Sequence, residues 1–382
     1  MTDRAGPVTE PGEKQARRPR RRPRSTVRDQ EDVLRVLGVL KVATATQIME
    51  LVRPHLSDNK AIRNALLALQ ADKLVLSAGS TAGPAGKFGA PDRRGEPSQK
   101  LWGLTPAGLD SAAEKLGREP DVMGGRARGA GAGGAPHAMA VNNTIVAFTR
   151  GGRLPGAPAG IGSIDCWRTE VPNPLTSSGK RNVRADAVFQ DKDAGLPLLM
   201  VEVDRATESV HVLADKVGAY ADFYARQVHD PALPGSTAPR RTTTGPGLLP
   251  HWTTLYPRTG LPPLAIVLTG AGPTALDNRI RTVADLSREH WAPRRMTGYG
   301  YRRTDAVGDY YLDFTDRIPL VMTTLERLQR CGPTGPTWFR IAPGRTEPEP
   351  LLQALTDTHT EAEFDQRQEQ RDQAAEAADD AR

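Results

Sequence analysis

The feature that most constrains the fold is residues 198–204 (LLMVEVD), an apolar run that ends in two carboxylates. Such a run predicts a buried strand that delivers charge to one edge of a sheet. Side chains of a strand alternate between its faces, so Glu202 and Asp204 project on one side and Val203 on the other. Buried carboxylates are costly unless they are paired, hydrogen-bonded or bound to a metal. The fold must therefore provide partners for both acids.

A third acid, Asp186, lies on a second predicted strand, residues 186–190, upstream of the first. If the two strands are neighbours, the three acids converge and offer the oxygen ligands that Mg²⁺ or Mn²⁺ prefers, an arrangement that suits phosphodiester chemistry. The alternative is a strand-end pair neutralised by Arg184 or Arg205 without a metal. The residues leave both interpretations open.

Composition favours a polyanionic partner. The chain has 382 residues, enough for two or three domains, and a formal net charge of +6. The charge is uneven, since residues 17–24 hold six arginines while the segment from Asp357 onward has nine acids and three arginines. These patterns predict a disordered basic arm at 1–24 and an acidic tail at 346–382.

Several classes of protein are excluded. Cys166 and Cys331 are far apart and outside any CxxC pattern, so neither a disulfide framework nor a zinc site is expected. No apolar run reaches the roughly 20 residues that span a bilayer, and the Arg-rich start of the chain lacks the apolar region of a secretion signal. We expect a cytoplasmic protein with no membrane partner.

Residues 25–118 predict a winged helix-turn-helix. Ser25 or Thr26 is placed to cap a first helix, whose apolar positions fall at helical spacing. Those positions are Val33, Val36, Leu37 and Leu40. A second helix follows residues 44–46, and a third follows Ser57. Two short strands, 74–76 and 101–104, flank the Gly/Pro/Arg-rich stretch 79–99, and a closing helix runs from Pro106 to about Leu116.

A winged helix inserts its third helix into the major groove of double-stranded DNA, while its wing contacts the backbone. The predicted DNA-binding residues are polar or basic. On the third helix they are Asn59, Lys60, Arg63 and Asn64, and on the wing they are Lys87, Arg93 and Arg94. The alternative is that the module is an adaptor that binds protein.

A Gly/Ala/Arg-rich linker at 119–136 is predicted to be flexible and to lead into a second domain, 137–345. The expected elements of this domain alternate between helix and strand. They are a helix at 137–149, strands at 164–171, 186–190 and 198–204, a helix at 208–226, a loop or disordered insertion at 230–262, a strand at 264–268 and a helix at 274–286. This order predicts an α/β sandwich with a central mixed sheet. Beyond residue 345 the hydrophobic pattern is lost apart from a short helix at 349–355, and the acidic tail is expected to be a solvated or fraying helix.

The spacing of Asp186, Glu202 and Asp204 resembles the restriction-endonuclease-like (PD-(D/E)XK) nuclease core. The resemblance implies that Asp186 and Glu202 are catalytic metal ligands and that Asp204 is a further ligand or supporting carboxylate. In that core a lysine follows the second acid by two residues, whereas Asp204 stands there in this chain. Lys216 on the next helix is the candidate replacement and would contact the scissile phosphate; Lys192 is loop-like and less suitable.

Other residues near this motif have simpler alternatives. Glu170 could join the acids from a neighbouring strand. A lysine at the position of Lys216 is more often a surface lysine whose stem lies on apolar neighbours than a catalytic one. His137 opens a helix and is expected to make a local hydrogen bond rather than bind a metal. Glu208 is expected to complement a helix dipole.

A wider set of motifs resembles the replication-relaxation family. The motifs are His137–Asn142, Trp167–Glu170, Arg184–Asp186, Val201–Glu208, Lys216 and Tyr220, and the resemblance covers roughly residues 30–340. It implies a role in plasmid replication or DNA relaxation in mobile elements of Gram-positive bacteria, with replication or conjugation proteins as partners.

Other chemistries are not supported. A relaxase centre needs two closely spaced histidines, and the seven histidines contain no such pair. The stretch 83–87 has the wrong glycine spacing for a phosphate loop, and Phe88 stands where Ser or Thr is needed. No Gly-x-Ser-x-Gly elbow is present. We therefore predict a DNA-binding, metal-dependent phosphodiester hydrolase; the alternative is a non-catalytic replication or transcription factor with a degenerate nuclease fold.

Overall fold

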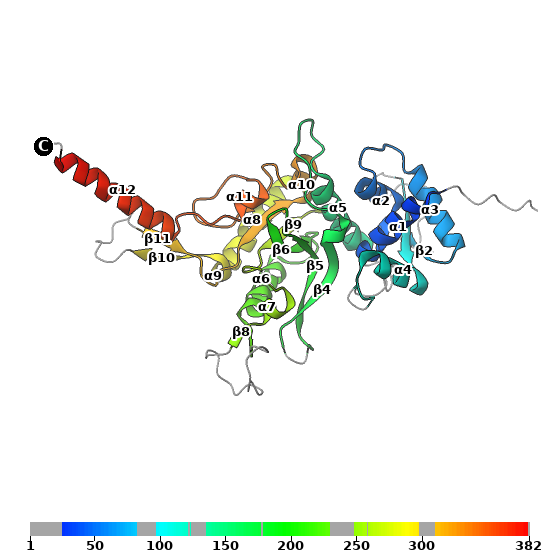
Figure 1. Ribbon diagram of the computed structural model, residues 1–382, viewed down its shortest axis with the longest axis horizontal. Helices are drawn as coiled ribbons and strands as arrows, with labels where there is room; N and C mark the ends of the chain where they lie inside the picture. Colours follow the sequence, from blue (N-terminus) through cyan, green and yellow to red (C-terminus); the bar gives the residue numbers. More distant parts are fainter. Residues whose placement is uncertain are drawn as a thin grey trace, which may run out of the picture.

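A six-stranded mixed sheet forms the centre of the protein (Figure 1). Its strands, in spatial order, are β13 (Phe339–Arg340), β12 (Leu320–Thr324), β9 (Leu264–Leu268), β6 (Leu196–Asp204), β5 (Asn182–Asp191) and β4 (Trp167–Pro174). β6, β9 and β12 are parallel, and the other pairings are antiparallel. The prediction of an α/β fold with a central mixed sheet is confirmed.

The structure is a computed structural model, and it describes residues 25–81, 97–120, 123, 135–176, 179–229, 248–257, 259–297 and 310–380. The predicted basic arm lies outside the described residues. So do Lys87, Arg93 and Arg94 of the predicted wing, and most of the predicted linker.

Helices cover both faces of the sheet. One face packs on α5 (Ala135–Arg150), α10 (Leu325–Cys331) and α11 (Leu351–Ala354), and the other on a second set of helices. That set comprises α6 (Val210–Ala225), α7 (His251–Leu255), α8 (Pro273–Leu286) and α9 (Arg288–Trp291). Because strand side chains alternate, β6 directs Val201 and Val203 to the first face and Met200 to the second. Glu202 follows Met200 by two residues and points toward α6.

The N-terminal unit consists of four helices and a three-stranded antiparallel sheet of order β1-β3-β2. Its elements are α1 (Val27–Leu40), β1 (Val42–Thr44), α2 (Ala45–Val52), α3 (Lys60–Ala71), β2 (Val75–Ser80), β3 (Lys100–Leu104) and α4 (Pro106–Leu116). Local signals set the helix starts: Thr26, Thr44 and Thr105 each accept a backbone N–H as N-cap, and Thr44 forms a capping box with Gln47.

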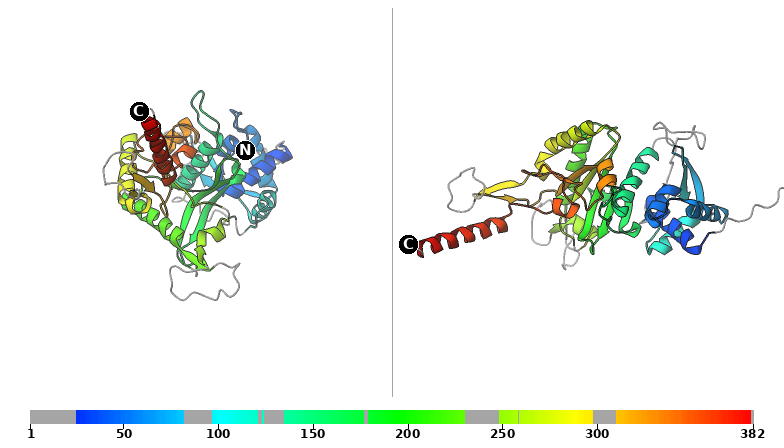
Figure 2. Two further views of the ribbon diagram at one scale, coloured as in Figure 1. Left: turned by 60° about the vertical axis from the view of Figure 1, so that its left-hand side comes forward. Right: turned by 90° about the horizontal axis from the view of Figure 1, so that it is seen from above.

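The N-terminal unit is docked on the sheet domain through a shared core. Buried residues of α1 and α2 form one hydrophobic cluster with α5 and Trp338, and two views show the unit beside α5 (Figures 1 and 2). Polar contacts add specificity. Asn142 Nδ2 donates to the Val42 carbonyl at 2.7 Å, and Thr169 Oγ1 donates to the Val39 carbonyl at 2.6 Å. The two parts are therefore held together by packing as well as by the connecting chain.

Replacing Asn142 with alanine is expected to destabilise the protein by roughly 1–3 kcal/mol, because a buried carbonyl loses its donor. Asn142 is 1% exposed. Urea denaturation of N142A against wild type measures the effect, with exposed Asn182→Ala as the matched control. Equal stability of N142A and N182A would show that this contact does not hold the two parts together.

Several elements differ from expectation. The segment 230–262 is not all loop, since β8 (Leu248–Pro250) pairs with β7 (Gln227–His229) and α7 follows, burying Trp252. Residues 164–166 form a 3₁₀ turn, and the strand begins only at Trp167. The prediction had no element for β12, although it is buried throughout. The sequence of β12, LVMTT, ends in two threonines, whereas the predicted strand 264–268 is apolar throughout, so β12 carries the weaker signal.

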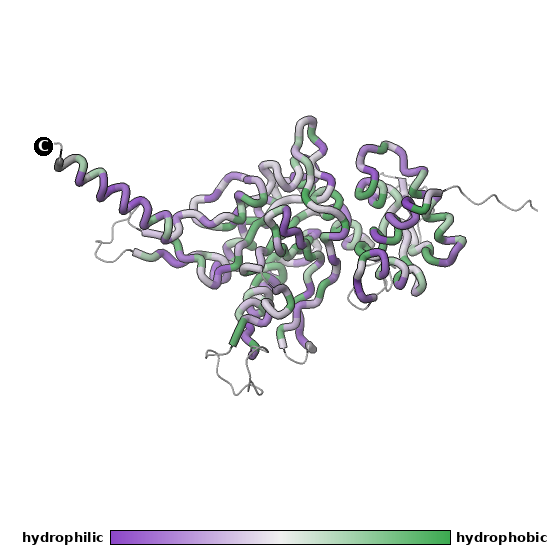
Figure 3. The backbone as a smooth tube through the Cα atoms, in the orientation of Figure 1, coloured by the Kyte–Doolittle hydropathy of each residue, from purple (hydrophilic) through white to green (hydrophobic). Residues whose placement is uncertain are grey.

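The C-terminal part begins with a small ribbon of β10 (Arg294–Thr297) and β11 (Tyr310–Asp313), which the sequence also did not predict. The acidic tail forms α12 (Glu361–Asp380), which extends away from the body (Figures 1 and 2). Figure 3 shows α12 as mostly hydrophilic, and Phe364 is its buried anchor. Among the described residues, no helix combines the length and apolarity that crossing a membrane requires.

Candidate functional site

Asp186 and Glu202 meet where β5 and β6 separate. Their last paired residues are Ala187 and Val201, and the two acids come next on their strands. Beyond this point the backbone N–H of Val203 donates to Asp186 Oδ2 at 2.8 Å. The Asp186 side chain therefore satisfies a strand donor that has no carbonyl partner on β5, and it is fixed at the opening between the strands.

Glu202 is 2% exposed and is held by α6. Tyr220 Oη donates to Glu202 Oε1 at 2.5 Å, and Lys216 Nζ donates to Oε2. Lys216 and Tyr220 lie one helical turn apart, so they reach the same carboxylate. Burial, together with the negative charge of Asp186, raises the pKa of Glu202 well above its ordinary value, and Lys216 offsets this only in part.

His137 is the second partner of Asp186. Its Nε2 lies 3.0 Å from Asp186 Oδ1. Burial by itself would raise the pKa of Asp186, but the hydrogen bond from His137 and the positive charge of Lys216 lower it. The same hydrogen bond is the main reason that the pKa of His137 is raised. We expected a local hydrogen bond for His137, but this contact is long-range: it joins the first turn of α5 to β5.

Lys216 contacts the buried acids rather than lying free on the surface. Burial would lower its pKa, but the charges of Glu202 and Asp186 raise it, so Lys216 stays protonated. Its side chain is one-third exposed. The cluster of His137, Asp186, Glu202, Lys216 and Tyr220 is called the carboxylate cluster below.

Glu202→Gln is expected to flatten the dependence of stability on pH at neutral and alkaline pH. Because the pKa of Glu202 is higher in the folded than in the unfolded chain, its contribution to stability is lost as pH rises from about 4.5 through the raised folded value. A neutral amide does not titrate, so we expect the stability of E202Q to fall less than that of wild type as pH rises. Urea denaturation across pH measures it. A pH profile of E202Q as steep as that of wild type would contradict the direction of the Glu202 pKa shift.

Asp204 does not join the carboxylate cluster, which corrects the prediction of three converging acids. Both of its oxygens accept from Arg279 of α8, Oδ2 from Nε and Oδ1 from Nη2 at 3.1 Å. Arg279 Nη2 also donates to the Glu208 carbonyl at 2.8 Å. A bidentate guanidinium neutralises a buried carboxylate without a metal. Among the described residues, no group of three or more His, Cys, Asp or Glu side chains is placed to hold a metal ion.

Glu170 and Lys192 also lie outside the carboxylate cluster. Glu170 is exposed on β4 and pairs with Lys41 Nζ at 2.9 Å. Lys192 is exposed in the turn between β5 and β6. Conversely, the sequence argument placed neither His137 nor Tyr220 in the site. Both residues belong to the motifs of the family resemblance, and Tyr220 also lies one helical turn from Lys216 on one helix face.

The predicted DNA-contact residues of α3 differ in their environments. Lys60 and Arg63 are exposed, and Asn64 is half-buried. Asn59 precedes α3, and its Nδ2 donates to Thr46 Oγ1 at 3.0 Å. Asn59 therefore ties the start of α3 to α2.

The carboxylate cluster offers a donor set suited to a hard divalent cation. Mg²⁺ in proteins commonly takes one or two carboxylates and completes its shell with water and substrate phosphate. Asp186 and Glu202 supply two carboxylates from adjacent strands. Because Lys216 and His137 already hydrogen-bond to them, a cation has to share or displace these donors.

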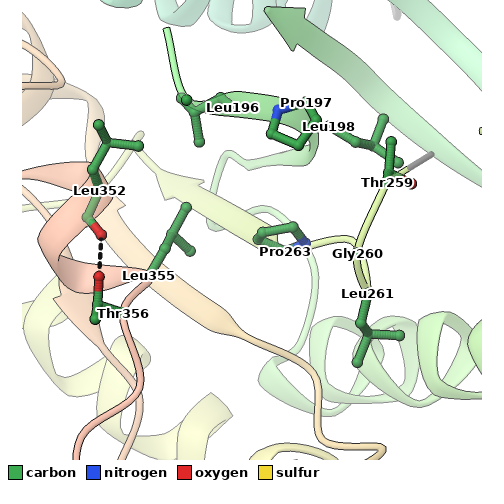
Figure 4. Close-up of a pocket in the computed structure, with 11 residues that line it drawn as sticks. Leu196, Pro197, Leu198, Thr259, Gly260, Leu261, Pro263, Leu352, Leu355 and Thr356 are labelled. Atoms are coloured by element: carbon green, nitrogen blue, oxygen red, sulfur yellow. Dashed lines mark hydrogen bonds between the residues drawn. The ribbon is translucent and has the colours of Figure 1, made fainter. Parts of the chain in front are cut away.

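An apolar pocket lies elsewhere, at the start of β6 (Figure 4). Leu196 and Leu198 form one side, Leu261 another, and Leu352 and Leu355 of the α11 region a third. It has no titratable side chain in its lining. The pocket is thus at the opposite end of β6 from Glu202 and the carboxylate cluster.

The fold and the carboxylate cluster define an α/β protein with two acids and a lysine where β5 and β6 separate. An N-terminal helical unit is docked on its sheet domain. The family model described as Replication-relaxation matches residues 34–235, more than half of the chain, and this protein belongs to the replication-relaxation family. The match covers α2, α3, the carboxylate cluster and α6. Family membership supports a role connected with plasmid replication. Neither curated proteins nor solved structures gave a match to this chain.

Proposed function

We propose that this protein binds double-stranded DNA and hydrolyses its phosphodiester backbone at the carboxylate cluster. The observation that carries the proposal is the convergence of Asp186, Glu202 and Lys216, from two adjacent strands and the helix that follows them. This arrangement supports a restriction-endonuclease-like core in which the lysine has moved to α6.

In this proposal Asp186 and Glu202 hold Mg²⁺ or Mn²⁺. A cation held there lowers the pKa of bound water and neutralises charge on the phosphate. Tyr220 keeps its proton, because burial raises its pKa well above the ordinary value, and it fixes one oxygen of Glu202. His137 orients Asp186. Lys216 stays positively charged and sits where it can pass from Glu202 to a substrate phosphate.

The N-terminal unit is proposed to be a winged helix that docks duplex DNA. Three helices, an antiparallel sheet and a closing helix support this topology, and Lys60 and Arg63 are exposed on α3. Lys87, Arg93 and Arg94 complete the proposed DNA contacts. Replication or conjugation proteins are the further partners proposed.

A second function, a non-catalytic DNA-binding replication or transcription factor, is favoured by one specific observation. All four carboxylate oxygens of Asp186 and Glu202 already have hydrogen-bond partners within the protein, and Asp204 is held by Arg279. Such a site is stable without a cation.

Incubation of the full chain with supercoiled plasmid and Mg²⁺ or Mn²⁺ tests the proposal, with EDTA as the control. Metal-dependent nicking or linearisation is the expected result. If plasmid stays intact while DNA affinity falls steeply with salt, the protein is a non-catalytic DNA-binding factor. If DNA affinity has no steep salt dependence, the N-terminal unit is an adaptor.

A further inference from the structure

The β4–β5 hairpin carries exposed positive charge beside the carboxylate cluster. Lys180 and Arg181 are exposed at its turn, and Arg184 is exposed on β5, two residues before Asp186. Residues 171–185 contain these three basic side chains and no acidic one. The outer part of the hairpin, between Glu170 and Asp186, therefore carries no acid that balances these three charges.

The outer part of this hairpin is a two-stranded ribbon. β5 stops pairing with β6 at Ala187, but it continues to pair with β4 as far as Asn182. Figure 1 shows β4 and β5 running beyond the centre of the sheet toward the turn that joins them. Val183 and Ala185 pack into the core on one side of the ribbon, and Arg184 between them is exposed. Residues 180–184 are called the basic ribbon below.

Further positive charge surrounds the buried acids. Arg205 directly follows β6 and is close enough to His137 to lower the pKa of that imidazole. Lys216 interacts electrostatically with both Asp186 and Glu202. The positive charge of the basic ribbon therefore extends along β5 toward Lys216 and Arg205 at the carboxylate cluster.

We propose that the basic ribbon binds the phosphate backbone of duplex DNA and leads it to the carboxylate cluster, as a second contact besides α3. This inference rests on the proposed DNA-binding function. A strand advances about 3.3 Å per residue, so Arg184 lies about 7 Å along β5 from Asp186. That distance is about two steps of a DNA strand, which rises about 3.4 Å per nucleotide. Arg184 therefore lies within about two nucleotide steps of the site, close enough to hold a phosphate that flanks the one at the carboxylate cluster.

The test measures the affinity of the full chain for a duplex of mixed sequence, roughly 30 base pairs long, in EDTA and over a range of salt concentrations. EDTA removes the divalent cations that the proposed cleavage needs, so the experiment measures binding alone. In R181Q/R184Q, loss of two phosphate contacts is expected to reduce the slope of log affinity against log salt by about 1.8 and to weaken binding about tenfold or more near 0.1 M salt.

Two controls distinguish charge from structure. R281Q/R330Q removes two exposed arginines from α8 and α10 and is expected to keep the wild-type slope. R181K/R184K keeps both charges and is expected to keep most of the slope as well. If R181Q/R184Q behaves like R281Q/R330Q, or if R181K/R184K loses as much as R181Q/R184Q, the basic ribbon is not a DNA contact. If the wild-type chain does not bind the duplex at all, the proposed DNA-binding function itself is wrong, which is a different result.

Discussion

Asp186→Asn and Glu202→Gln are each expected to reduce metal-dependent plasmid nicking by at least about 100-fold. The two carboxylates are the metal ligands of the proposed site, and a neutral amide binds a hard divalent cation weakly. Removing a group that stabilises charge in the transition state typically costs about 100- to 1000-fold in rate. Nicking rates with Mg²⁺ and Mn²⁺ measure the effect.

The design of this experiment separates chemistry from folding. Urea denaturation of D186N and E202Q at the assay pH shows whether each variant is folded, so a loss of nicking is not mistaken for unfolding. Asp222→Asn on α6 is the matched control, since Asp222 is exposed. Lys216→Met is expected to reduce the nicking rate, and the nicking that remains is expected still to require Mg²⁺ or Mn²⁺. Nicking that persists in D186N and E202Q comes from elsewhere, and the carboxylate cluster is then not a nuclease site.

Arg279→Ala is expected to destabilise the protein by about 3–5 kcal/mol, because it leaves Asp204 buried without its guanidinium. Asp204 is 9% exposed, and both of its oxygens accept from Arg279. Arg279 also binds the Glu208 carbonyl, so its loss loosens the segment between β6 and α6. Chemical denaturation measures the change in the free energy of unfolding.

Two further variants identify the cause. D204N/R279M removes the charge together with its partner, so it is expected to recover much of the stability lost in R279A. Arg281→Ala, two residues along the same helix and exposed, is expected to change stability by less than about 0.5 kcal/mol. If R279A is as stable as R281A, the Asp204–Arg279 pair contributes nothing, and Asp204 becomes available as a ligand again.

The candidate site was predictable only in part. The two strands and the following helix have clear local signals: apolar runs of strand length for β5 and β6, and helical spacing for α6, whose N-cap in the structure is Ser209. Adjacent strands in antiparallel order then bring Asp186 and Glu202 together. The choice of partner for each acid was not predictable, since Arg279 and His137 lie far away in the sequence and on elements that dock only through tertiary packing.

The amino-acid sequence alone determined the starts of the capped helices, the buried strand that ends in Glu202 and Asp204, and membership of the replication-relaxation family, because these depend on short-range spacing and residue type. Tertiary structure alone decided that Asp204 pairs with Arg279 while Glu202 pairs with Lys216. Buried charge takes whichever partner the packed helices bring within reach. Tertiary structure likewise decided that the N-terminal unit docks on α5, because that contact depends on complementary apolar surfaces from distant segments.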